Sequence, residues 1–480
     1  MTSQENVNLS SYPRRRFHLQ INFWWLIFIA LNFFVYLNYS IGTPICFDDC
    51  LSYTELMGKG SLTRYITTWH SMWRPWFVPV FFSFFGEYSL SSALSINIAQ
   101  TIILFISWTI FAASIAQQFS GRFAKITFVI LSLSIYAQQY YILNRYLLSD
   151  SLALSTLLFF LSIVISFSQL RKKIGIKNAI CLLLITALIA TGSRDANVMF
   201  ALLGTIYILF FNYKTITRLQ LLTIIVAIAI ICINQMNHAS YRHYLNVKHV
   251  LAGFVLPHPA VADFFITRGM PANLNKGIDL KPQEWCTVNY PQINENARLA
   301  NIPDKYIYRA SKIYALWLLS HPIYVMQQAF NDRDCILGQS YATSPSLLMM
   351  GAQTEEASYI RPGEKATAIQ QGIIRIAPAD FFDPKIKMMI ALSLSVLFIF
   401  LYALKKNNYL AVSVFLIVSG FLNAVSSYFA DMWSPSEMLR HAFIGSIIFN
   451  VGFVVSIIAA IAFLFSFFTR SRQTTKNALH

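Results

Sequence analysis

The chain has 480 residues, of which 56% are hydrophobic and only 12% are charged, and its mean hydropathy is +0.51. Soluble domains carry about 25% charged residues, so this composition excludes an ordinary water-soluble enzyme and indicates a protein that crosses a membrane several times. The net charge of +16 does not indicate nucleic-acid binding, because Lys and Arg accumulate in the cytoplasmic loops of membrane proteins.

The chain begins with a polar tail, residues 1–20, that carries three consecutive arginines, Arg14 to Arg16. The apolar segment that follows, 21–39, is longer than the apolar core of a signal peptide and lacks a small-residue cleavage site. We therefore expect an uncleaved first spanning helix whose basic end lies in the cytoplasm.

An acidic pair follows this helix in the first outer loop, residues 41–89. Asp48 and Asp49 precede a helix-like run, 50–57, that stops at Gly58. One interpretation is capping, because an Asp side chain accepts the free N–H groups of a first helical turn. The other is a catalytic carboxylate at the outer surface of a membrane enzyme, and the residues alone leave both open.

The same loop continues into an aromatic stretch that predicts an interfacial helix. Trp69, Trp73 and Trp76 fall on one helical face, which is typical of tryptophans at the level of lipid headgroups. Arg64 and Arg74 flank this stretch. A guanidinium donates hydrogen bonds in pairs to phosphate, so either arginine could hold a lipid-linked substrate or a lipid headgroup.

Further apolar segments predict about ten transmembrane helices in total. The N-terminal module covers 21–234 and the C-terminal module covers 386–468, followed by a cytoplasmic tail at 469–480. The expected spans after the first are 90–116, 123–141, 147–167, 177–191, 197–212, 219–234, 386–404, 409–430 and 442–468.

The loop charges support this arrangement, because basic residues fall in every second connection. We therefore expect both termini in the cytoplasm and the remaining connections outside. The basic residues on the expected cytoplasmic side are Arg122, Lys125, Arg171, Lys172, Lys173, Lys177, Lys214, Arg218, Lys405, Lys406, Arg470 and Arg472.

The long polar region 235–385 is large enough for a small extracytoplasmic loop domain. Cys286 and Cys335 lie in it, and an oxidising compartment would most simply join them in a disulfide. Cys46 and Cys50 flank the acidic pair, but no histidine accompanies them at ligand spacing, so a metal site there is the weaker alternative.

The remaining polar clusters all fall on the expected outer face: Asp150; Arg194 with Asp195; and Glu437, Arg440 and His441. Asp150 is explained as a helix cap, and Arg194 with Asp195 as a local ion pair. The last three residues share one face of a helix at positions i, i+3 and i+4. Ionisable groups at membrane depth need partners or a cavity, so their common side indicates a functional surface.

The chain contains no Walker loop, GxSxG elbow, HExxH helix or GxGxxG run. Nucleotide hydrolysis, serine hydrolysis and zinc proteolysis therefore have no support in the sequence.

Taken in order, the acidic pair after the first span, the amphipathic stretch and the outer polar face resemble the GT-C superfamily of membrane glycosyltransferases. The run 148–152 resembles an acidic helix start common in these enzymes, and 437–441 resembles an acid–x–x–Arg–His signature of some bacterial envelope-glycan hexosyltransferases. The resemblance covers the first half and the last fifth of the chain. It does not extend to the loop 235–385, whose insertion departs from that superfamily.

The resemblance implies transfer of a sugar from a polyprenyl-phosphate donor to an envelope glycan, lipid or protein acceptor. Asp48 would act as the base with Asp49 in support, and Arg194 or Arg440 would bind the phosphate. No cofactor or metal ligand is required, although a divalent metal is compatible with this chemistry. The expected partners are these substrates and the bilayer, without nucleic acid. The loop 235–385 has no Asn-x-Ser/Thr site, which favours a bacterial inner membrane.

Three alternatives remain at this stage. An O-antigen polymerase or ligase predicts essential Arg and His residues in the long loop and dispensable aspartates. A flippase or transporter of lipid-linked sugars predicts charges near the membrane midplane and broken helices. A non-enzymatic assembly factor is the third.

Overall fold

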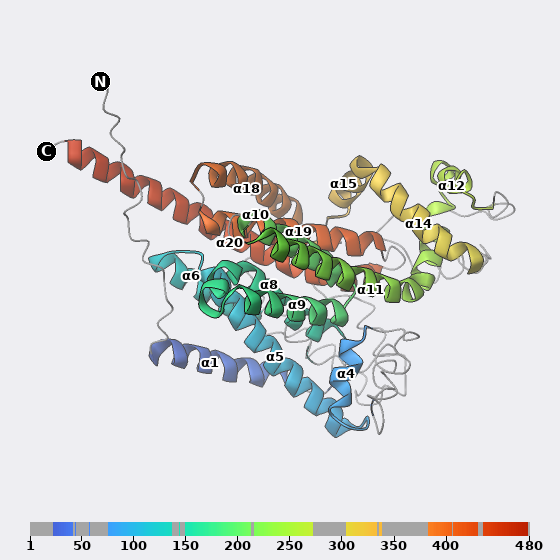
Figure 1. Cartoon of the computed structure of the whole chain (residues 1–480), viewed down its shortest axis with the longest axis horizontal. Coiled ribbons are helices and arrows are strands. Elements are labelled where there is room, and N and C mark those ends of the chain that lie inside the picture. The colour runs from blue at the N-terminus through green and yellow to red at the C-terminus, as the bar shows by residue number, and fades with distance from the viewer. Residues whose placement is uncertain are drawn as a thin grey trace.

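The computed structural model describes residues 23–41, 44, 57, 75–136, 144, 149–212, 216–271, 304–333, 336–337, 383–405, 407–430 and 435–478. At 235–246, 435–441 and 470–478 it describes only the backbone. Every regular element in these ranges is a helix (Figure 1). The expected all-α fold is therefore confirmed for the described part of the chain.

Six described helices are long and apolar enough to cross a membrane, which confirms a multi-pass membrane protein. They are α5 (Leu90–Ala116), α8 (Ser149–Ile174), α9 (Ile176–Ser193), α18 (Pro384–Lys405), α19 (Asn408–Ala430) and α20 (Pro435–Ala478). Three shorter apolar helices accompany them: α1 (Phe23–Ser40), α10 (Asn197–Asn212) and the first part of α11 (Arg218–Val250). The total of about ten spans stays a prediction.

The expected span at 123–141 takes a different form. Helix α6 (Gly121–Leu133) has 13 residues and is followed by the short 3-10 helix η2 (Ser134–Tyr136). A helix of 13 residues is about 20 Å long, which is shorter than the roughly 30 Å of a bilayer core. Within the described residues this segment is therefore too short to span a bilayer as a straight helix.

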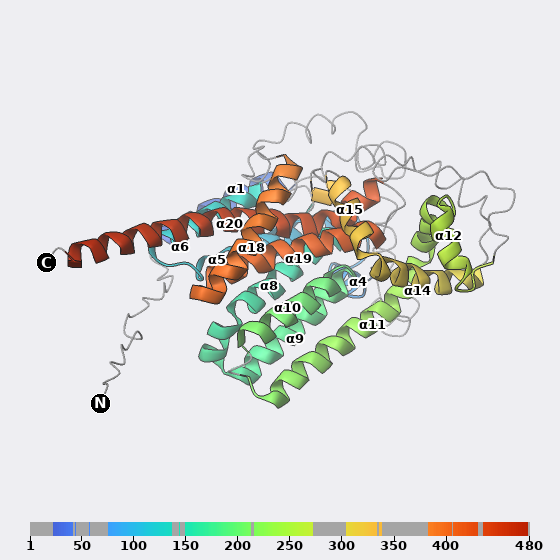
Figure 2. The same cartoon turned by 90° about the horizontal axis from the view of Figure 1, so that it is seen from above.

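The bundle has two chemically different ends. Helix α8 ends with Arg171, Lys172 and Lys173, and we call this the basic end. The start of α19 lies at the same end, because the rings of Phe119 and Tyr409 stack there at 5.1 Å. The opposite end, where α8 begins and α9 ends, we call the polar end. The end of α20 lies on the side away from α12 (Pro259–Ile266) and α14 (Asp304–Ser320) in both views (Figures 1 and 2).

Helix α8 forms the centre of the N-terminal half. It packs against α5 on one side and α9 on the other, and it is buried over most of its length. Small residues such as Ser151, Ala153 and Ser155 line its buried surface, and small side chains allow membrane helices to approach closely. Helix α1 packs against α5 at the edge of this group.

Helices α19 and α20 form the most extensive pair in the bundle. A side chain at Gly420 would overlap the backbone of Phe449, and one at Gly445 would overlap the backbone of Ala424. Gly452 continues this line of close approach on α20. The glycines therefore allow the two backbones to touch, as small residues do in other membrane helix pairs.

The region expected as a separate loop domain shares a core with the spanning helices. Helix α11 continues past residue 234, the expected end of its span, to Val250, and it leads into η4 (Leu251–Val255) and α12. Side chains of α14 lie in one apolar cluster with those of α18, α19 and α20. A domain that folds apart from the membrane is thus not confirmed, and Cys46, Cys50, Cys286 and Cys335 lie outside the described residues.

Candidate functional site

Buried polar side chains gather at the polar end of the bundle, where α1 and α9 end and α8 and α10 begin. We call this set the polar layer, and every member is at most 7% exposed. Polar groups at membrane depth are costly unless they are hydrogen-bonded, so such a concentration marks a candidate functional site. The members are Tyr36, Asn97, Asn144, Asp150, Ser151, Arg194, Asn197 and Asn423.

An ion pair between Asp150 and Arg194 lies in this layer. Asp150 is in the first turn of α8, where the helix dipole favours a negative charge, and Arg194 is the residue that ends α9. The sequence predicted a local pair of Arg194 with Asp195. The structure places the Arg194 guanidinium against Asp150, 44 residues away in the chain, because antiparallel α8 and α9 bring the two helix ends together.

Asp150 thus has a partner outside its own helix. Its carboxylate is fully buried and Arg194 is 7% exposed, so both charges are removed from water. Burying two charges is expensive, and the loss of one partner from such a pair typically costs about 3–5 kcal/mol. Asp195, the next residue, is half-buried.

Asn144 joins three helices beside this ion pair. Its Nδ2 donates to the hydroxyl of Tyr36 in α1 at 2.7 Å, and its Oδ1 accepts from Ser151 Oγ in α8 at 2.6 Å. Asn97 in α5 donates to the backbone carbonyl of Asn144 at 2.7 Å and lies 3.5 Å from the carbonyl of Ser40. The end of α1 is thereby linked to the start of α8.

The seam between α8 and α9 is held by side-chain hydrogen bonds. Thr156 Oγ1 donates to Ser193 Oγ at 3.0 Å. Asn197 Nδ2 donates to two backbone carbonyls, those of Ala153 at 3.2 Å and Ala190 at 2.9 Å. These bonds hold the turn that carries Arg194 against both α8 and α9.

Helix α19 contacts the same turn from the C-terminal half of the chain. Asn423 Nδ2 donates to the carbonyl of Ala196 at 2.7 Å across 227 residues of sequence. The side-chain oxygens of Asn423 and Asn197 are buried and have no hydrogen-bond partner among the described residues. Buried acceptors of this kind are normally satisfied, so a water or a substrate hydroxyl would find two acceptors here.

The start of the first loop and Trp76, within the same loop, lie beside this layer. The loop leaves α1 at Ser40, close to Asn97, and the structure next describes a continuous chain from Pro75. The indole of Trp76 packs so closely on Gly192 that any side chain at that position would overlap it. Gly192 lies two residues before Arg194, so α4 (Phe77–Ser83) starts beside the ion pair.

The other predicted site residues stay predictions. Asp48, Asp49, Arg64 and Arg74 lie outside the described residues. Glu437, Arg440 and His441 lie in the first turns of α20, as their spacing predicted, but only their backbone is described.

Sequence reasoning missed Lys387. This residue lies in the first turn of α18 and is 3% exposed, and its Nζ donates to Asn450 Oδ1 of α20 at 3.1 Å. A lysine at the start of an apolar span is normally expected at the membrane interface. The side chain of Lys387 instead points toward α20 and is buried. An ionisable residue inside a spanning segment is a functional candidate in its own right. The sequence feature that could have indicated this contact is Asn450, a polar residue within an apolar run.

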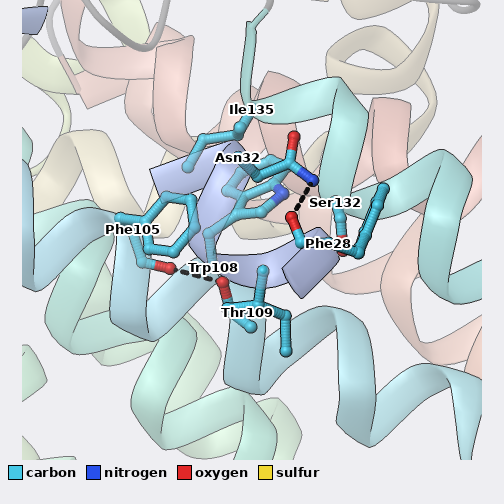
Figure 3. Close-up of a pocket in the computed structure, with 8 residues that line it drawn as sticks. Phe28, Asn32, Phe105, Trp108, Thr109, Ser132 and Ile135 are labelled. Atoms are coloured by element: carbon cyan, nitrogen blue, oxygen red, sulfur yellow. Dashed lines mark hydrogen bonds between the residues drawn. The ribbon is translucent and has the colours of Figure 1, made fainter. Parts of the chain in front are cut away.

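A small hollow lies apart from the polar layer, between α1, α5 and α6 (Figure 3). The space inside it is about 10 Å³, room for roughly one water molecule. Two side chains on its wall bond to their own helices, Asn32 to Phe28 at 3.0 Å and Thr109 to Phe105 at 2.8 Å. The hollow is thus too small for a sugar-phosphate, and the polar layer remains the candidate site.

Comparison of the chain with known protein families, curated proteins and solved structures gives no match. The features of the molecule that bear on its function are therefore the polar layer, the first loop and their position in a membrane protein.

Proposed function

We propose that this protein is a membrane glycosyltransferase that moves a sugar from a polyprenyl-phosphate donor to an envelope glycan, lipid or protein acceptor. The polar layer supports this proposal because it lies at one end of a bundle of membrane-spanning helices. A lipid-linked sugar has its chain in the bilayer and its phosphate at the boundary. A buried arginine at that boundary suits such a substrate.

The observation that carries the proposal is that the first loop starts beside the polar layer and returns to it at Trp76. Asp48 follows Ser40 by eight residues, a length of chain that spans at most about 29 Å. The proposal places the acidic pair beside Arg194. An anchor for a spanning helix would not need this combination of a tethered acidic pair and a buried cation.

The proposed reaction uses one carboxylate as general base. Asp48 takes the proton of the acceptor hydroxyl, the oxygen attacks the anomeric carbon, and the bond from that carbon to the phosphate oxygen breaks. The products are the new glycoside and the polyprenyl phosphate, with Asp49 supporting the base. Arg194, oriented by Asp150, stabilises the charge of the departing phosphate, with Arg440 as the second candidate.

The remaining predicted residues would bind around this centre. Arg64 and Arg74 are candidate contacts for the lipid phosphate or for headgroups, while Glu437 and His441 share their helix face with Arg440. A monophosphate donor has no pyrophosphate to clamp, so the scheme requires no metal.

The proposal includes an orientation, with the polar end outside a bacterial inner membrane and the basic end in the cytoplasm. The basic residues at the end of α8, Arg171 to Lys173, support it. Reporter fusions at Lys172 and Gln283 are expected to report opposite sides of the membrane. The same side for both fusions would contradict the orientation.

The activity is tested with Asp48→Asn and Asp49→Asn in protein purified into liposomes, using a panel of radiolabelled polyprenyl-phosphate sugars. Asn caps a helix as well as Asp but cannot accept the proton, so a capping role predicts full activity. Loss of a general base is expected to lower the rate about 10²–10⁴-fold in at least one variant at normal abundance.

Glu87→Gln is the matched control, because Glu87 is an exposed acid at the far end of the same loop. It should retain full activity. Full activity of both aspartate variants would refute the proposed base and move the polymerase and transporter alternatives ahead.

A further inference from the structure

Helices α14 and α15 (Pro322–Asn331) leave a line of large apolar side chains exposed. The exposed fractions are 49% for Leu316, 80% for Leu319, 73% for Ile323, 46% for Met326 and 37% for Phe330. Leu316 and Leu319 are three residues apart on α14, and Ile323, Met326 and Phe330 are three and four residues apart on α15, so each helix presents these side chains on one face. We call these five residues the α14–α15 stripe, and large contiguous apolar surfaces of this kind mark interaction sites.

Two contacts fix the position of α14 and α15 along the axis of the spanning helices. Tyr314 of α14 donates to the carbonyl of Phe429 at 3.0 Å, and Tyr428 donates to the Asp332 carboxylate at the end of α15. Burial raises the pKa of the Tyr314 phenol well above its usual value, which fits a dry contact. Tyr428 and Phe429 lie in the last turn of α19, where its apolar span ends.

The lengths of the two helices exclude a simple crossing. Helix α15 has 10 residues, or about 15 Å, which is half of a bilayer core. Helix α14 has 17 residues but carries the exposed cations Arg309 and Lys312 in its first half. A helix with one apolar face and a charged flank lies along a membrane surface rather than across it.

The basic residues near the stripe suit anionic headgroups. Arg309 is exposed and contacts Gly269, the residue next to the exposed Arg268 at the end of α12. Arg333 follows α15, with its guanidinium 5.3 Å from the ring of Phe330. A Lys or Arg near an anionic membrane surface is attracted to it.

We propose that the α14–α15 stripe lies in the boundary between headgroups and acyl chains of the leaflet at the polar end. The stripe continues the lipid-exposed surface of neighbouring α18, where Ile386 and Met389 are half exposed. Both views place α15 beside α18 and the polar end of α19 (Figures 1 and 2). Residues 304–331 are thus a membrane-surface element, and this inference does not depend on the glycosyl-transfer proposal.

The test uses a photoreactive benzoylphenylalanine at Leu319 or at Ile323 in the full chain, reconstituted with phosphatidylethanolamine and phosphatidylglycerol. Mass spectrometry then measures the lipid adducts after illumination. Val396, 71% exposed on α18, is the positive control, and Asp263, an exposed acid on α12, is the negative control.

Lipid adducts at both stripe positions should match those at Val396 and exceed those at Asp263 several-fold. Adducts to a second copy of the chain would show that the stripe is a subunit interface, and adducts to other segments of the same chain would show that protein covers it. Yields of lipid adduct equal to those at Asp263 would show that water covers it. Each of these three results overturns the proposal.

Discussion

Two helix pairs in this bundle are held together by opposite means. Between α8 and α9 the contacts include the Asp150–Arg194 ion pair and the hydrogen bond of Thr156 to Ser193. Between α19 and α20 the backbones touch at Gly420 and Gly445.

The difference shows which of the two helix contacts contains more than packing requires. Lipid tails are as apolar as leucine, so membrane helices associate through close packing or through polar bonds. The contact between α19 and α20 at Gly420 and Gly445, which we call the glycine seam, holds the two helices together by close packing without any charge. The α8–α9 seam carries an ion pair that well-packed apolar residues could replace without loss of stability. Under the proposed function these charges serve the chemistry, and four predictions test this comparison.

The largest effect is expected from Arg194→Met, which leaves the fully buried Asp150 carboxylate without its guanidinium. Removing one partner of a buried pair should lower the free energy of unfolding by about 3–5 kcal/mol. Thermal unfolding in detergent, together with the amount of protein in the membrane, measures this loss. An unchanged melting temperature would show that the pair adds nothing to the fold.

The double variant Asp150→Leu with Arg194→Met separates structure from chemistry. Replacement of both charges by apolar residues is often neutral or stabilising, so abundance and melting temperature should recover. With Arg194 as the proposed phosphate contact, glycosyl product should stay absent. Recovery of product in the double variant would make the ion pair purely structural.

A smaller loss is expected from Gly445→Val on the glycine seam. The new side chain would overlap the backbone of Ala424, and overpacking of this kind costs about 1–3 kcal/mol. Abundance and product should fall in proportion, because this seam only supports the fold. Leu464→Val, at a position on α20 that is 53% exposed, is the control and should change neither quantity. Loss of product at normal abundance would contradict the structural role of the seam.

The smallest effect is expected from the hydrogen bond of Thr156 to Ser193, measured by a double-mutant cycle with Thr156→Val and Ser193→Ala. Hydrogen bonds between membrane helices contribute about 0.6 kcal/mol on average. The coupling energy from unfolding measurements should be near this value, and product should be unchanged. A loss of product in either single variant would show that the hydroxyl of Thr156 or Ser193 is also needed for activity.

The sequence alone determined the helices themselves. The expected spans 90–116 and 197–212 coincide with α5 and α10, because a continuous apolar run that ends in polar residues fixes where a helix enters and leaves a bilayer. The same reasoning misjudged α11, which continues to Val250 past the expected end at 234. Hydropathy reports the membrane boundary, whereas a helix can extend into water beyond it.

The tertiary structure alone decided which polar residues meet. Asp150 and Arg194 are separated by 44 residues, and Asn423 reaches the carbonyl of Ala196 across 227. Hydropathy carries no information on which faces of two apolar helices pack together, since small residues and polar bonds select those faces one contact at a time. For the same reason the sequence did not show that Lys387 would meet Asn450 of α20.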